Sequence, residues 1–75
     1  MRVEPILVRE KRFNFLPQRF LYRGTERQVW RVERTWDASA TWNRNARHYF
    51  DVRCTDDRRF RLVHDVALNA WYAER

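Results

Sequence analysis

The stretch RHYFDVRC, residues 47–54, carries the clearest structural pattern in the chain. Every second residue could face a core, as in a strand with one buried side; these residues are His48, Phe50, Val52 and Cys54. Residues 59–64, RFRLVH, alternate in the same way. A loop at residues 55–57 would pair Val52 with Phe60 and bring both apolar sets to one side. The sequence therefore predicts an antiparallel hairpin at this point.

Shorter segments before this hairpin predict further strands. They are residues 6–8, residues 18–22 and a longer strand from residue 27 to residue 37. Residues 9–16 are charged and aromatic without a clear period, and residues 38–46 are expected to form the longest loop. We therefore expect a meander of antiparallel strands.

Gly24, the only glycine of the chain, separates two of these strands. A turn that needs positive φ would place a glycine there, so the two strands are expected to form a hairpin. A longer turn of four residues would set Phe20 opposite Val29. Trp30 then falls on the other side, and either a β-bulge re-aims the strand or Trp30 is partly exposed.

The last segment, residues 65–75, allows two structures. Asp65 could cap a short helix, or the chain could turn and return as a strand at residues 71–73, which its length slightly favours. The predicted fold is a single small all-β domain over residues 1–75, an antiparallel meander of five or six strands forming a barrel or a strongly twisted sheet. The alternative is an α+β fold with a short C-terminal helix. The expected core is Phe20, Tyr22, Val29 or Trp30, Phe50, Val52, Phe60, Leu62 and Trp71.

Few residues of the chain could carry catalysis or bind a metal ion. Cys54 is the only cysteine, so the chain cannot form an internal disulfide, and it lies about 20 Å along the strand from His48. His48 and His64 face each other in the predicted register, but two histidines make an incomplete metal site. No Gly-rich phosphate loop, Gly-x-Ser-x-Gly or Cys-x-x-Cys motif occurs. We therefore expect a protein that is not an enzyme and that uses no metal and no cofactor.

The chain has no apolar run long enough to cross a membrane and no pattern of a secretory leader. A single cysteine fits a reducing compartment. These features predict a cytoplasmic protein with no membrane partner.

Positive charge is the most informative feature of the composition. The chain has 16 basic and 10 acidic residues, and its first 34 residues contain nine basic residues against four acidic ones. Guanidinium groups interleaved with aromatic rings could bind phosphates while the rings stack on bases. The predicted binding residues are Arg19, Arg23, Arg27, Arg31, Arg34, Trp30, Trp36 and Trp42. Tyr49 is a further ring that the core does not require.

The favoured function is thus a non-enzymatic module that binds single-stranded nucleic acid through an Arg-rich, aromatic hairpin. An acidic protein surface is the alternative partner, because Arg and Trp are also enriched in protein-binding hot spots. In that alternative the domain is a protein-interaction adaptor. Residues 6–8 or the C-terminal strand would then be free sheet edges that can accept a partner strand.

Several segments together carry a family likeness. They are PQRFLYRG at residues 17–24, YFDV at 49–52, FRL at 60–62 and WYAER at 71–75, with Val32 and Trp36 between them. In these features the chain resembles an uncharacterised family of small bacterial all-β domains, which is similar to the C-terminal extension of catalytically inactive Y-family-polymerase-like subunits of bacterial mutasomes. The resemblance implies a strand at the C-terminus and an association with DNA-repair assemblies.

Overall fold

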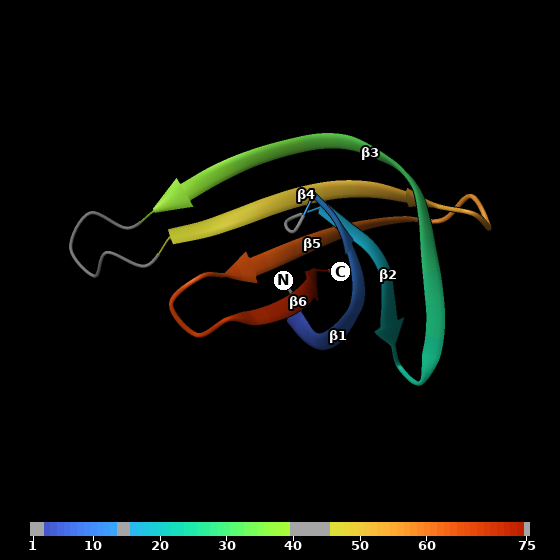
Figure 1. Ribbon diagram of the computed structural model, residues 1–75, viewed down its shortest axis with the longest axis horizontal. Helices are drawn as coiled ribbons and strands as arrows, with labels where there is room; N and C mark the ends of the chain where they lie inside the picture. The colour runs from blue at the N-terminus through green and yellow to red at the C-terminus, as the bar shows by residue number, and fades with distance from the viewer. Residues whose placement is uncertain (1–2, 14–15, 40–45, 75) are drawn as a thin grey trace.

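The structure is a computed structural model that describes residues 3–13, 16–39 and 46–74. Its strands are β1 (Val3–Arg12), β2 (Leu16–Tyr22), β3 (Thr25–Ser39), β4 (Ala46–Cys54), β5 (Arg59–Asp65) and β6 (Ala70–Glu74). Each strand pairs antiparallel with the next, and β1 pairs with β6, so the sheet closes into a barrel (Figure 1). The predicted all-β meander is confirmed. None of the described residues belongs to a helix that is long and apolar enough to span a bilayer.

Two bent strands close the barrel. The first residues of β1, Val3–Ile6, pair with β6, whereas its later residues pair with β2. β3 changes partner in the same way, from β2 to β4 after Gln28, and Figure 1 shows it bending over the molecule at this point. The expectation that residues 6–8 and the C-terminal strand are free edges is therefore wrong. Barrel closure pairs the first strand with the last, which removes these edges.

The turn between β2 and β3 is tighter than expected. Tyr22 pairs with Thr25, and the two residues between them have positive φ, 51° for Arg23 and 76° for Gly24. This is the two-residue connection whose twist matches that of the strands. Phe20 therefore pairs with Arg27 and not with Val29. The loop between β4 and β5 agrees with the prediction, since Val52 pairs with Phe60 and Phe50 pairs with Leu62.

Two β-bulges in β3 explain why its alternation did not define one inward side. The register against β4 shifts between Val29 and Arg31 and again between Val32 and Arg34. One extra residue enters the strand at each shift, so two consecutive residues point away from the core. Val29 is 2% exposed, whereas Trp30 is 56% exposed. Of the two core candidates, Val29 is therefore the one that the barrel buries.

Aromatic rings fill most of the core. The buried residues are Phe20, Tyr22, Val29, Phe50, Val52, Cys54, Leu62, Trp71 and Ala73, with Phe60 partly buried against them. The Phe20 and Phe60 rings meet edge to face at 5.5 Å, and the Phe50 and Trp71 rings stack at 5.6 Å. Edge-to-face and offset stacking are the favourable geometries for such pairs. The core therefore supports the closed barrel although the chain has few aliphatic residues.

Pairing with neighbours also extends several strands beyond the segments expected from periodicity. β1 continues to Arg12 through residues expected to be irregular, because register shifts around Glu10 disturb the alternation without ending the strand. Ala38 and Ser39 pair with Arg47 and Ala46 as an extension of the β3–β4 hairpin, and the remainder of the expected long loop lies outside the described residues.

The tail forms β6 and no helix. The Asp65 carboxylate accepts a hydrogen bond from the Leu68 backbone N–H at 3.2 Å, so it caps the turn before β6. Asn69 then adopts a φ of 49°, which an Asn tolerates better than most residues. The segment therefore turns and returns as the strand that the sequence slightly favoured.

Candidate nucleic-acid interface

Three of the predicted arginines form ion pairs within the molecule. Arg19 lies 3.2 Å from Glu26, and Arg27 pairs with Asp56. Arg23 donates two hydrogen bonds to the Glu4 carboxylate, one of them at 2.8 Å, and these bonds raise the pKa of the Arg23 guanidinium. These arginines are therefore less available for phosphate than the sequence suggested.

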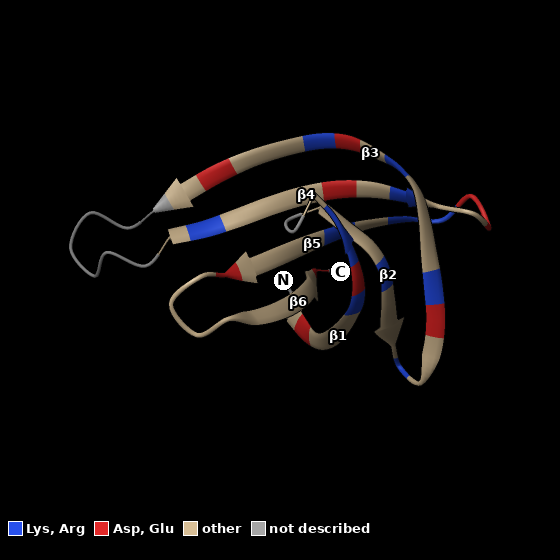
Figure 2. Ribbon diagram, in the orientation of Figure 1, with Lys and Arg blue, Asp and Glu red and all other residues tan. Residues whose placement is uncertain are grey.

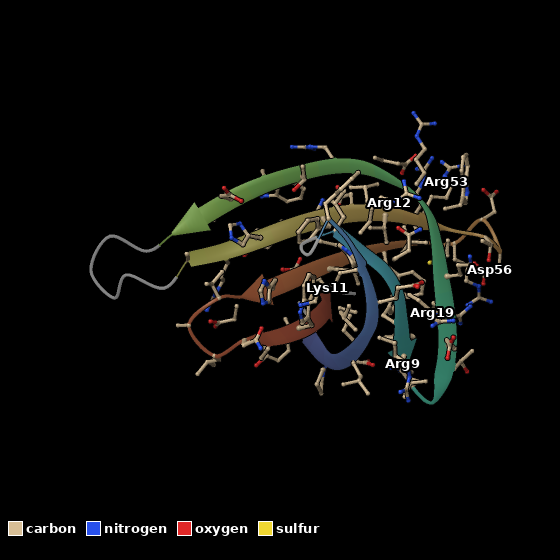
Figure 3. The ribbon with its side chains drawn as sticks, viewed as in Figure 1. Arg9, Lys11, Arg12, Arg19, Arg53 and Asp56 are labelled. Carbon is tan, nitrogen blue, oxygen red and sulfur yellow. The ribbon has the colours of Figure 1, made fainter. Side chains whose placement is uncertain are left out.

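The paired charges gather at one end of the barrel. Arg53 and Arg59 both lie near Glu33, at 3.2 and 3.6 Å. Figure 3 shows Arg53 and Asp56 at the end of the molecule where the β4–β5 loop lies, with Arg19 on β2 nearby. Figure 2 shows basic and acidic residues interleaved along β3 and β4. The basic excess of the first half of the sequence therefore does not form one basic face at this end.

The outer face of β3 brings together other predicted residues. Because of the two bulges, Trp30 and Arg31 point away from the core together, and so do Glu33 and Arg34. Trp36 follows on the same side, paired with Tyr49. We call the side of β3, β4 and β5 that points away from the core the outer face. Four of the eight predicted residues lie on it: Trp30, Arg31, Arg34 and Trp36.

Trp36 is the centre of a compact cluster on the outer face. Its ring stacks on Tyr49 with centroids 5.2 Å apart and an angle of 5° between the planes. The guanidinium carbons of Arg34 and Arg61 each lie 4.9 Å from the centre of the Trp36 ring, close enough for cation–π attraction. We call Trp36, Tyr49, Arg34 and Arg61 the Trp36 platform.

The two arginines of the Trp36 platform differ in their partners. Arg61 donates two hydrogen bonds to Asp51, at 2.8 and 3.2 Å, and this carboxylate raises the pKa of the Arg61 guanidinium. Arg34 forms no ion pair with any acidic residue that the structure describes, and neither does Arg31. Arg34 and Arg31 are therefore the cations of the outer face best placed to bind an anion.

The sequence analysis missed Arg61 as a site residue. Arg34, Asp51 and Arg61 lie in one row across β3, β4 and β5. The predicted β4–β5 register already pairs Asp51 with Arg61, but Arg34 joins the row only through the bulges in β3. Trp42, the remaining predicted residue, lies outside the described residues.

β1 carries further cations. Arg9, Lys11 and Arg12 form no ion pair with the acidic residues that the structure describes (Figure 3). The Lys11 ammonium lies 5.9 Å from the centre of the Trp71 ring. Lys11 therefore lies on the side of the core ring Trp71 and not on the outer face.

The two histidines lie on the side of β4 and β5 that faces the core. His48 and His64 are paired across β4 and β5 as predicted, with ring centroids 6.2 Å apart. His48 Nδ1 bonds to Asp37, while His64 Nε2 lies 3.1 Å from the Asn69 side-chain oxygen and its ring stacks on Trp71 at 4.3 Å. Among the described residues, no three His, Cys, Asp or Glu side chains are arranged to hold a metal ion. The histidine contacts are those of side chains engaged within the fold.

Cys54 is buried at the end of β4, and this burial raises the pKa of its thiol from 9.0 to about 11. Only the thiolate is reactive, so we expect iodoacetamide to modify the folded protein slowly at about pH 8 and the urea-unfolded chain rapidly. The free energy of unfolding should also fall as the pH rises from about 9 to about 11, because the thiol ionises first in the unfolded state. Urea titrations across this range test the second effect.

A Cys54→Ala variant provides the control for those titrations. It lacks the thiol but keeps every other group that ionises in the same range. A decline of the same size in both proteins would show that Cys54 is not its cause.

No protein-family model, curated protein or solved structure matches this chain. The resemblance to mutasome-associated domains therefore stays a prediction. The candidate site depends on its own geometry.

Proposed function

We propose that this domain is a binding module for single-stranded nucleic acid and that the strand lies across the outer face at the Trp36 platform. The observation that carries the proposal is the placement of Arg34, a guanidinium without an acidic partner among the described residues, 4.9 Å from the Trp36 ring. Proteins that bind single strands combine cations for the backbone with rings for the bases. The Trp36 platform offers both on one surface.

Two aromatic rings are not part of the core, and this supports the assignment. The interior is filled by rings from Phe20, Tyr22, Phe50 and Trp71, with Phe60 packed against them. Trp36 and Tyr49 point to the other side of the sheet and are not needed to fill it. Rings stacked beside arginines on an outer face favour a role in binding.

The salt dependence of binding tests the proposal and locates the surface. We expect the affinity for a fluorescein-labelled oligothymidine to fall steeply with salt, because bound phosphates displace counterions. Arg34→Gln should reduce the slope of log affinity against log salt by about one. Arg23→Gln is the matched control and should change the slope little, since Glu4 already neutralises Arg23.

The other possible outcomes would contradict the proposal. A larger effect of Arg23→Gln than of Arg34→Gln would place the nucleic acid on the β2–β3 hairpin, and an equal effect would show that the outer face is not the preferred surface. The absence of binding at about 50 mM salt would overturn the nucleic-acid proposal.

A protein-interaction adaptor is the second candidate function. Val3, Pro5 and Leu7 alternate along β1 and are all exposed, so one side of that strand is an apolar stripe. Such a stripe is typical of a surface that contacts another protein. It lies on β1, where Pro5 pairs with Tyr72 of β6, and none of its three residues belongs to the Trp36 platform on β3, β4 and β5.

A further inference from the structure

A hollow lies beside the Trp36 platform on the same side of the sheet. Its volume is about 310 Å³, and its lining includes Tyr49, Val63 and Tyr72, which the strand register places in one row across β4, β5 and β6. Tyr49 lies on β4 and Tyr72 on β6, with β5 between them, so the backbones of β4 and β6 are about 10 Å apart. Val63 is only 6% exposed, so neighbouring side chains already cover most of it, and a flat aromatic ligand in the hollow would contact the two tyrosine rings.

A buried carboxylate lines this hollow. Asp65 is 6% exposed, and its Oδ1 accepts the Leu68 N–H. Among the described residues, no hydrogen-bond donor reaches Oδ2, and Arg47, its cross-strand neighbour, forms no ion pair with it. Oδ2 is not among the side-chain atoms that are sealed from solvent without a partner, so it remains accessible, and a ligand that covers it must supply donors in place of water. The ligand is thus expected to present N–H groups to Asp65.

The surrounding charge decides which kind of donor the hollow accepts. Arg47 lines it, and Arg61 lies opposite the other lining carboxylate, Glu74, in the register of β5 and β6. The chain as a whole has a net charge of +6. A cationic side chain of a partner would be repelled by this field, whereas a nucleotide brings an anionic phosphate together with a neutral base.

Among the common bases, guanine fits a carboxylate best. Its Watson–Crick edge presents two adjacent donors, N1–H and the N2 amino group, which match the two oxygens of Asp65. Adenine and cytosine place an acceptor beside their amino group, and thymine and uracil place their one N–H between two acceptors. We propose that the hollow binds a guanine base of the single strand, with Tyr49 and Tyr72 on either side and Asp65 on its Watson–Crick edge. This inference rests on the proposed function.

Base replacement in the ligand tests the inference without altering the protein. The probes are fluorescein-labelled oligothymidines that carry one central guanine, one inosine or no substitution. Inosine lacks the N2 amino group and retains N1–H. We expect the guanine probe to bind about ten-fold more tightly than the inosine probe, as for loss of one good base contact.

Asp65→Asn tests the role of the carboxylate. Asparagine keeps an oxygen for the Leu68 N–H but turns an amide NH₂ group toward the donors of guanine, so the preference for guanine over inosine should be lost. Glu10→Gln is the matched control, because it makes the same change from a carboxylate to an amide, but at an exposed residue on β1 that does not line the hollow. It should keep the preference.

The outcomes separate this inference from the function on which it rests. Equal affinity of the unaltered protein for all three probes, with steep salt dependence, would overturn the guanine site and leave nucleic-acid binding intact. A full guanine preference in folded Asp65→Asn would overturn the assignment to Asp65. Failure of every probe to bind at about 50 mM salt would overturn both. If Asp65→Asn does not fold, the comparison of guanine with inosine in the unaltered protein still decides.

Discussion

Replacing Trp36 with Leu is expected to weaken the binding of oligothymidine by roughly 5- to 150-fold, which corresponds to the loss of one base–aromatic stack. The substitution also removes the surface on which Arg34 and Arg61 rest at 4.9 Å, so their guanidinium groups lose a fixed orientation. Leucine is apolar and covers part of the same sheet surface, so the barrel should remain folded. Fluorescence anisotropy at low salt measures the affinity, and thermal unfolding checks the fold.

Trp36→Phe is the informative companion to this substitution. Phenylalanine keeps a flat ring next to Tyr49, so it should restore most of the affinity if the platform acts by stacking. The paired substitution at Trp30, which is exposed on the same strand, should cost less, because no stacked ring or cation–π contact holds Trp30 among the described residues. Unchanged affinity in Trp36→Leu would exclude the Trp36 platform as the binding surface.

The β4–β5 hairpin could be predicted from sequence because its period is undisturbed. His48, Phe50 and Val52 occupy every second position, and both apolar sets face inside only if the loop has an odd number of residues; the expected loop of three residues gives the observed register. Residues opposite one another then follow by counting, and this is why the pairing of His48 with His64 was also correct.

β3 could not be predicted in the same way, because a bulge adds a residue without leaving a local mark in the sequence. Val29 and Val32 face the core, three residues apart, where an undisturbed strand would place them on opposite sides. Only the pairing with β4 shows where the extra residues lie. For that reason the alternation of residues could not predict which side chains share the outer face of β3, although Trp36 and Arg34 were both among the predicted residues.

Ion pairs between residues that are distant in sequence could not be predicted from local patterns either. Arg27 lies on β3 and Asp56 in the β4–β5 loop, so the rest of β3 and the whole of β4 separate them in sequence, yet the barrel brings them together. Arg23 meets Glu4 in the same way. Arg23 and Arg27 seemed unopposed because their acidic partners lie elsewhere in the chain and are brought close by the closed sheet, whereas Arg19 pairs with Glu26 of the same hairpin. This moves the proposed site from the hairpin to the outer face.

Phe20→Ala is expected to destabilise the domain by about 3–5 kcal/mol, the typical cost of deleting a buried phenyl ring. Phe20 is 0% exposed and meets Phe60 edge to face, and it lies on β2, which joins the two bent strands. A domain of this size has a free energy of unfolding of about 4–11 kcal/mol, so the substitution should remove a large share of its stability and unfold it if the stability lies at the lower end of that range. Urea denaturation followed by circular dichroism measures the loss.

Phe13→Ala is the matched control, because the same atoms are deleted from a ring that is 76% exposed. The free energy of unfolding of this variant should stay within about 0.5 kcal/mol of that of the unaltered protein. Similar losses in the two variants would contradict a core built around Phe20, since only a ring enclosed by the barrel leaves a cavity when it is removed.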